Sequence, residues 1–247
     1  MCENRPLFLK FLLCSMFFVK IAGAQELTSD SLTNSLYNSF PVKLYFNALG
    51  ENAHTFNGYE YFTPDRNIKG SPYFLADGPI PADLDYDDSY YQNIPILYDL
   101  VKDEVIINRL GQNYKISLVS DKLNSFFVRK HEFIRVSSDS ANGIQLPTGF
   151  YDRMYAGKTT VLVKRKRRLQ ETYIYNTTGY EYIEENVYYV IFAGQIVQVD
   201  GKSSVMNLFK SKKSEIKAFL RKNKLNFKSD FEKTLIATSA YYDQLTS

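Results

Sequence analysis

Asn93–Asn108, NIPILYDLVKDEVIIN, is the stretch that decides the fold. Ile94–Leu100 is a nearly continuous apolar run, and Val105–Ile107 is a second, shorter one. The polar pair Lys102-Asp103 lies between them, where a turn would reverse the chain. Two short apolar runs joined in this way predict a β-hairpin whose strands are mostly buried.

The same pattern recurs on both sides of this hairpin. Gly-containing turns at 156–158 and 193–194 and the Asn57-Gly58 pair each separate two short alternating segments, and such turns are typical of hairpins. The predicted strands are Val42–Phe46, Tyr59–Phe62, Tyr114–Val119, Glu132–Val136, Gly149–Tyr155, Thr159–Val163, Val187–Phe192 and Gln195–Val199.

The pattern changes at Gly201, where apolar residues adopt a spacing of three and four. Ser229 and Glu232 have the spacing of a capping box, which predicts the start of a helix that continues to Leu245. We therefore expect an α+β fold in a single domain, 41–247. An antiparallel meander covers 41–200 and two or three amphipathic helices cover 201–247, packed on or beside the sheet.

Residues 1–24 have the features of a signal peptide. Arg5 and Lys10 precede the apolar run Phe11–Val19, and Ala22-Gly23-Ala24 supplies small residues at a cleavage site. We expect export to the periplasm, the outer membrane or the medium, with a polar lead-in at 25–40 and no transmembrane helix in the mature chain. Both cysteines fall within residues 1–24, so the mature chain has no thiol for catalysis, zinc or disulfides.

The charge is unevenly distributed along the chain. Residues 25–110 contain 5 basic and 13 acidic residues, whereas 111–247 contain 22 basic and 13 acidic ones. Either the two halves attract each other within one body, or the second half presents a basic face to an acidic partner. A nucleic-acid partner is not expected, because it conflicts with export and with a nearly neutral mature chain.

Four segments resemble a group of exported envelope proteins of Bacteroidota that has no assigned function. They are YFNALGEN (Tyr45–Asn52), FNGYEY (Phe56–Tyr61), NIPILYDLVKDEVII (Asn93–Ile107) and NKLNFKSDFEKTLIATSAYYDQL (Asn223–Leu245). The resemblance implies an envelope location and transfers no catalytic residue to this chain.

An acidic segment, ADLDYDDSYY, is the candidate metal site. Asp83, Asp85 and Asp87 are spaced like the first oxygen ligands of a calcium loop, but the glycine and the closing glutamate of that loop are absent. The alternatives are a loose cation site, a solvated acidic loop, or an acidic patch that meets the basic half of the domain.

The most concentrated charge in the chain is the basic run Lys164-Arg165-Lys166-Arg167-Arg168. On a strand, Lys164, Lys166 and Arg168 would face one way and the two remaining arginines the other, so we expect a solvated ribbon. It could bind a polyanion such as anionic lipid or lipopolysaccharide. Alternatively, a turn at 176–179 could bring Glu181, Glu184 and Glu185 back beside it as cross-strand partners.

Histidine-dependent catalysis would have to use His54 or His131, and neither lies in a recognisable motif. We therefore expect a non-catalytic binding or scaffolding module of the envelope, without a cofactor, whose partner is an envelope protein or an anionic surface. One alternative is an extracytoplasmic hydrolase with two convergent carboxylates, one of them with a raised pKa. The other is a polyanion-binding protein that uses the basic run.

Overall fold

The computed structural model describes residues 56–65, 67–75, 77–108, 114–138, 146–174 and 177–246. All of these residues belong to one structural unit, Leu49–Ser247. The expected signal peptide (1–24), the lead-in (25–40), the strand Val42–Phe46 and His54 lie outside the described residues.

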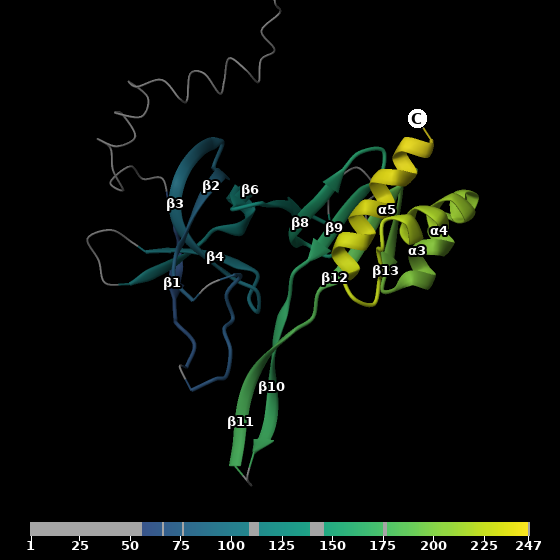
Figure 1. The fold of residues 1–247 in the computed structure, drawn as a ribbon. Helices are drawn as coiled ribbons and strands as arrows, with labels where there is room; N and C mark the ends of the chain where they lie inside the picture. Colours follow the sequence, from purple (N-terminus) through teal and green to yellow (C-terminus); the bar gives the residue numbers. More distant parts are fainter. Residues whose placement is uncertain are drawn as a thin grey trace, which may run out of the picture. The chain divides into compact units, whose positions relative to one another are not determined.

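Antiparallel strands dominate the described chain, as the sequence predicts (Figure 1). Eleven of them form one sheet in the order β1-β5-β4-β3-β2-β6-β7-β8-β9-β12-β13, and β10 and β11 form a separate two-stranded sheet. The strands are β1 (Gly58–Tyr61), β2 (Ile80–Tyr86), β3 (Ser89–Asp99), β4 (Glu104–Asn108), β5 (Lys115–Leu118), β6 (Leu123–Val128), β7 (His131–Val136), β8 (Gly149–Ala156), β9 (Thr160–Lys164), β10 (Arg167–Ile174), β11 (Thr177–Glu184), β12 (Val187–Phe192) and β13 (Gln195–Val199).

The central hairpin is confirmed. β3 pairs antiparallel with β4, with Ile96 opposite Ile107 and Asp99 opposite Glu104. Leu97 and Ile106 are buried on the other face of the same two strands, in a cluster separate from the main core. Because both faces of this part of the sheet are covered, its strands appear in the sequence as continuous rather than alternating apolar runs.

The predicted turn at Asn57-Gly58 is wrong. Gly58 begins β1, which pairs with β5 through Gly58 opposite Leu118 and Tyr61 opposite Lys115. A Cβ atom at position 58 would collide with the backbone carbonyl of Ser117. Glycine is therefore required here because two strands approach closely, and not because the chain turns.

The acidic segment is also ordered differently from the solvated loop that we considered. Ile80–Tyr86 is the strand β2, which lies between β3 and β6 in the sheet. Ala82, Leu84 and Tyr86 are buried, while Asp83 and Asp85 occupy the alternate positions on the other face. The acidic residues are thus the outward half of a half-buried strand.

Three helices follow the sheet: α3 (Lys202–Leu208), α4 (Lys213–Lys222) and α5 (Phe231–Leu245). They gather beside β12 and β13, and α5 also contacts β8 and β9 (Figure 1). The predicted capping box at Ser229 is wrong, because Asp230 caps α5 by accepting a hydrogen bond from the Lys233 amide at 3.0 Å. Glu232 therefore does not cap the helix, and its carboxylate accepts hydrogen bonds from Arg165.

Two large apolar clusters hold the unit together. The first lines β2 to β8 and is rich in stacked rings, such as Phe126 on Phe133 at 4.7 Å between ring centroids. The second joins β9, β12 and β13 to the helices, with Phe209 stacked on Tyr242 at 4.4 Å. The helices are consequently the covering layer of the second half of the sheet, as expected for amphipathic segments that need an apolar partner.

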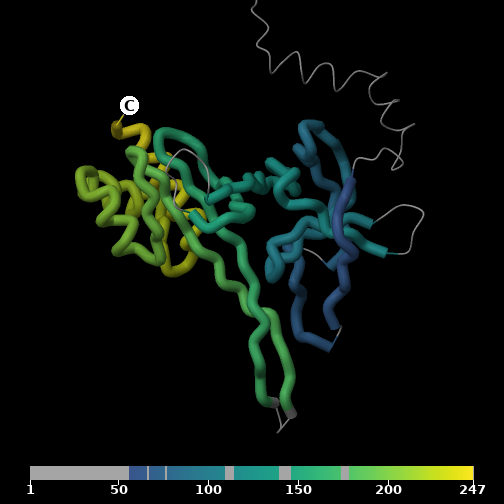
Figure 2. The backbone as a smooth tube through the Cα atoms, turned by 180° about the vertical axis from the view of Figure 1, so that it is seen from behind, coloured from purple at the N-terminus to yellow at the C-terminus, as the bar shows by residue number. Residues whose placement is uncertain are grey.

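Between β9 and β12 the chain leaves the large sheet as a two-stranded ribbon, β10–β11, and then returns (Figure 2). The register runs from Arg167 opposite Glu184 at its base to Ile174 opposite Thr177 at its end. This ribbon begins directly at the basic run, so the run lies where the chain departs from the sheet.

Candidate functional site

The structure buries the first half of the basic run. The residues Lys164 and Arg165 are only 5% and 7% exposed, whereas Lys166 and Arg168 are exposed. The expectation that the whole run is solvated is therefore wrong for Lys164 and Arg165. The physical reason is that each of these two cations meets a carboxylate inside the protein.

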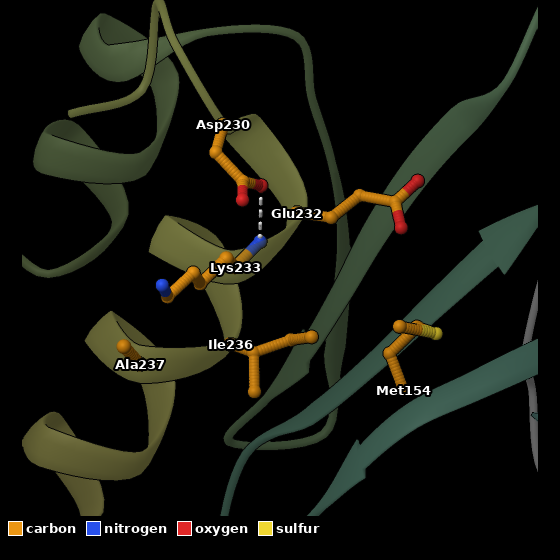
Figure 3. Close-up of a pocket in the computed structure, with 6 residues that line it drawn as sticks. All are labelled: Met154, Asp230, Glu232, Lys233, Ile236 and Ala237. Carbon is orange, nitrogen blue, oxygen red and sulfur yellow. Dashed lines mark hydrogen bonds between the residues drawn. The ribbon is translucent and has the colours of Figure 1, made fainter. Parts of the chain in front are cut away.

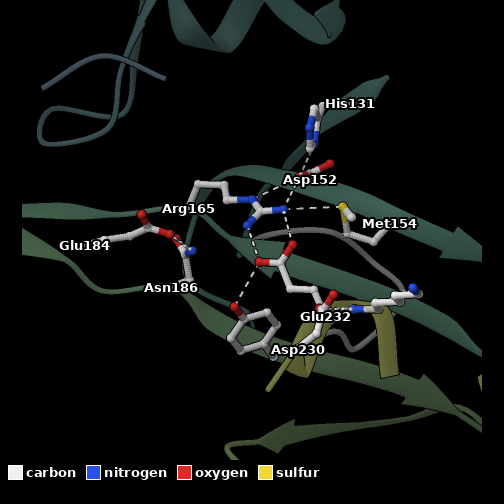
Figure 4. A network of polar contacts seen from close by, with 10 residues as sticks. His131, Asp152, Met154, Arg165, Glu184, Asn186, Asp230 and Glu232 are labelled. Atoms are coloured by element: carbon white, nitrogen blue, oxygen red, sulfur yellow. Dashed lines mark hydrogen bonds and ion pairs between the residues drawn. The ribbon is translucent and has the colours of Figure 1, made fainter. Parts of the chain in front are cut away.

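Arg165 is the centre of a polar network that joins three parts of the fold (Figure 4). Its Nε and Nη2 donate to Oδ2 of Asp152 on β8, at 2.9 and 2.7 Å. Nη1 and Nη2 also donate to the carboxylate of Glu232 on α5, the latter at 3.1 Å. The guanidinium thus ties the end of β9 to its neighbouring strand and to the covering helix.

Two further side chains complete the network. His131 Nδ1 lies 2.7 Å from Oδ2 of Asp152, and the Tyr188 hydroxyl donates to Glu232 at 2.9 Å. Asp152 is fully buried, and its Oδ1 has no hydrogen-bond partner among the described residues. One oxygen of this carboxylate therefore accepts hydrogen bonds from Arg165 and contacts His131, while the other is left unsatisfied.

The network shifts the pKa values of Arg165 and Tyr188. Burial alone would lower the pKa of Arg165, but hydrogen bonding to Glu232 and the charge of Asp152 outweigh burial and raise it. Burial, followed by the nearby Glu232 charge, raises the pKa of Tyr188 to about 12. The arrangement is thus a charged arginine between two carboxyl groups, with a neutral tyrosine that donates to one of them.

Lys164 makes a second buried connection. Its Nζ pairs with Oδ2 of Asp103 in the β3–β4 turn and donates to the Phe150 carbonyl at 3.1 Å. Burial lowers the pKa of Lys164, and Asp103 opposes this shift. The hydroxyl of Tyr98 donates to the other oxygen of Asp103 at 2.6 Å, so both carboxylate oxygens are occupied.

Of the other residues in the basic run, Arg167 makes internal hydrogen bonds and Arg168 makes an exposed ion pair. Arg167 donates through Nη1 to the backbone carbonyls of Ser71 and Tyr73, the latter at 2.8 Å. Arg168 pairs with Glu185, as the cross-strand alternative predicts, and this pair is about half exposed. Four of the five basic side chains therefore have partners inside the described chain.

A shallow pocket of about 470 Å³ adjoins the network beside α5 (Figure 3). It is lined by Met154, Asp230, Glu232, Lys233, Ile236 and Ala237. Its two carboxylates already accept hydrogen bonds, Asp230 from the Lys233 amide and Glu232 from Arg165. The pocket therefore contains two carboxylates that are already engaged by other groups of the protein.

The three candidate metal ligands are not brought together. Asp83 accepts from Tyr90 and from the Asn93 amide, at 3.2 and 2.9 Å, while Asp87 pairs with Lys122 at 2.8 Å. Asp85 is within 3.4 Å of the Asn124 amide nitrogen. Within the residues that the structure describes, no three His, Cys, Asp or Glu side chains are grouped as metal ligands.

Sequence reasoning missed Asp152 and Glu232, the two partners of Arg165. A signal for Asp152 was present, because it shares a strand with the buried Phe150 two residues earlier and so faces the same side. Glu232 carried no such signal, since its spacing from Ser229 favoured a capping role.

In the described part of the chain, no helix is long and apolar enough to cross a bilayer. In comparisons with known proteins, no family model, curated protein or solved structure matches this chain.

Proposed function

We propose that the protein is an exported, non-catalytic binding module of the cell envelope, and that the β10–β11 ribbon contacts its partner. The observation that supports this is a stripe of exposed apolar side chains on the ribbon. Leu169, Tyr173 and Tyr180 are 45%, 74% and 47% exposed. Clustered exposed apolar groups of this kind mark interaction sites.

The register places these side chains on one face. Leu169 is opposite Tyr182, and Tyr173 is opposite Thr178, with Tyr180 opposite Glu171 between them. Directly opposed residues of an antiparallel pair point to the same side, so Leu169, Tyr173 and Tyr180 form a continuous surface. We call these three residues the ribbon stripe.

The ribbon also has an open edge. β11 is bonded along its outer side to Lys69, whose amide donates to the Tyr180 carbonyl at 2.9 Å. At the base of β10 the Arg167 amide donates to the Leu100 carbonyl at 3.1 Å, and beyond this point β10 has no strand partner other than β11 in the described chain. An open edge accepts an extended segment of another protein by β-augmentation. We therefore propose a protein partner that adds a strand along β10 and covers the ribbon stripe.

The two alternatives have less support. Polyanion binding by all five residues 164–168 would require Lys164 to leave Asp103, which is partly buried, and Arg165 to leave Asp152, which is fully buried. For the hydrolase, the two carboxylates that line the pocket, Asp230 and Glu232, each already accept a hydrogen bond from another group of the protein. The three side chains of the ribbon stripe are exposed, and the Tyr173 hydroxyl donates to Glu171 on the same strand at 3.0 Å.

Site-specific photocrosslinking in the native envelope tests the proposal. A photoreactive residue at Tyr173 should give one discrete adduct, and the same residue at Tyr59, which is 79% exposed on β1, should not. The adduct should disappear when Leu169 and Tyr180 are both changed to Ser. Equal adducts at both positions, or none at Tyr173, would contradict the proposal.

Export itself is tested separately. We expect the mature protein, purified from the envelope fraction, to begin at Gln25 by mass spectrometry. An intact Met1 in a cytosolic fraction would contradict this part of the proposal.

A further inference from the structure

A second basic region lies in the helical segment, and its cations are mostly exposed, unlike Lys164 and Arg165 of the basic run. Residues 201–230 contain nine Lys or Arg and two Asp or Glu. Among the described side chains, only Lys212 has an ion-pair partner in this segment, Glu215 at 3.7 Å. The exposed cations include Lys210, Lys213, Lys217, Arg221, Lys222 and Lys224, which together we call the basic helical surface.

On α4 the cations form a row. Lys213, Lys217 and Arg221 are four residues apart and therefore neighbours on one side of the helix, and all three are exposed. Ile216 and Leu220 are buried in the cluster beneath. Like charges at this spacing repel one another and weaken a helix, so folding does not explain why three of them are aligned.

The charges are also of the kind that suits a diffuse anionic surface. Eight of the nine cations in 201–230 are lysines. Lysine presents a hydrated point charge on a flexible stem, whereas arginine provides a planar fork for a defined carboxylate or phosphate. In contrast, Arg165 and Arg167 in the basic run make directed hydrogen bonds inside the protein.

No large exposed hydrophobic side chain is found in the described residues of the helical segment, 201–246. Insertion into the apolar part of a bilayer is therefore not expected, and binding should depend on charge. Anionic headgroups attract clusters of Lys and Arg that are close to the membrane surface.

We infer that the basic helical surface adsorbs to an anionic phospholipid bilayer. This inference rests on the proposed location in the envelope, but it uses a different surface from the ribbon stripe. Adsorption would hold α4 against the membrane, and the ribbon would bind its protein partner independently.

Vesicle sedimentation tests the inference with the full chain. Binding to vesicles of phosphatidylglycerol and phosphatidylcholine is compared with binding to phosphatidylcholine alone, which measures any contribution of the apolar Phe11–Val19. Each basic residue near a charged membrane contributes about fivefold to binding. The variant K213Q/K217Q/R221Q should therefore bind anionic vesicles roughly 100-fold more weakly.

The matched control is K130Q/K166Q/R168Q, which removes the same charge from three other exposed positions. It should keep most of the binding, and raising salt should release the wild-type protein. Circular dichroism should show that both variants are folded, because all six residues are exposed.

Equal losses in the two variants would show a net-charge effect and overturn the assignment. Absence of wild-type binding to anionic vesicles at low salt, or retention only on a soluble polyanion such as heparin, would also overturn it. None of these outcomes bears on the crosslinking result at Tyr173, so the two proposals fail independently.

Discussion

Replacing Arg165 with Met should destabilise the protein strongly. The change removes both hydrogen bonds that Arg165 donates to Asp152, a carboxylate that is fully buried. Among the residues that the structure describes, His131 is then the one group left against Asp152 Oδ2. Breaking a buried ion pair from one side costs about 3–5 kcal/mol. Glu232 adds less, because its side chain is 29% exposed and can be hydrated.

The assay is urea unfolding followed by circular dichroism, with Arg168→Met as the matched control. Arg168 carries the same group three residues later, but its pair with Glu185 is about half exposed and should contribute at most about 1 kcal/mol. An Arg165→Met loss no larger than that of Arg168→Met would refute the reasoning.

Three further outcomes follow from the structure. Gly149→Ala should lower the free energy of unfolding by at least the roughly 1–3 kcal/mol of a strained backbone, because φ is +144° at this position. The added Cβ would also displace the Lys164 ammonium. Thermal unfolding measures the loss. Asp230→Ala should lower the free energy of unfolding by about 1 kcal/mol because it removes the α5 cap. Ser229→Ala should change it by less than about 0.5 kcal/mol. If urea unfolding gave the reverse order, Ser229 rather than Asp230 would be the cap. The pKa of Tyr188 is about 12 in the folded state, whereas an unfolded tyrosine ionises near pH 10, so the free energy of unfolding should fall between these pH values. Tyr188→Phe should make this fall less steep. An unchanged slope would contradict the environment assigned to Tyr188.

The elements that could be predicted from the sequence are those with a local signal. The hairpin Asn93–Asn108 is correct because its two apolar runs and the polar turn between them are adjacent in the chain. The acidic residues of β2 are typical of a solvated segment, but Ala82, Leu84 and Tyr86 alternate with them and are buried in the sheet. The period of two was the better indicator.

The polar network could not be predicted in the same way, because its partners come from distant parts of the chain. Arg165 meets Asp152 thirteen residues earlier and Glu232 sixty-seven residues later. A concentrated basic run gives no indication of which charges will be neutralised by contacts of this kind. Only the pair of Arg168 with Glu185 followed from a local turn, since the hairpin itself brings them together.

These contacts change the meaning of the charge pattern. The basic run mainly connects β9 to the β3–β4 turn, to β8 and to α5, while the basic helical surface keeps its cations exposed. In this chain the start of the most concentrated basic run is internal, whereas the cations of the basic helical surface are exposed.

A double-mutant cycle between Arg165 and Asp152 tests the internal role of the basic run most directly. The free energies of unfolding of Arg165→Met, Asp152→Leu and the double variant should give a coupling energy of at least about 1.5 kcal/mol, since contacting buried charges are strongly non-additive. Single effects that add to within about 0.5 kcal/mol would contradict it.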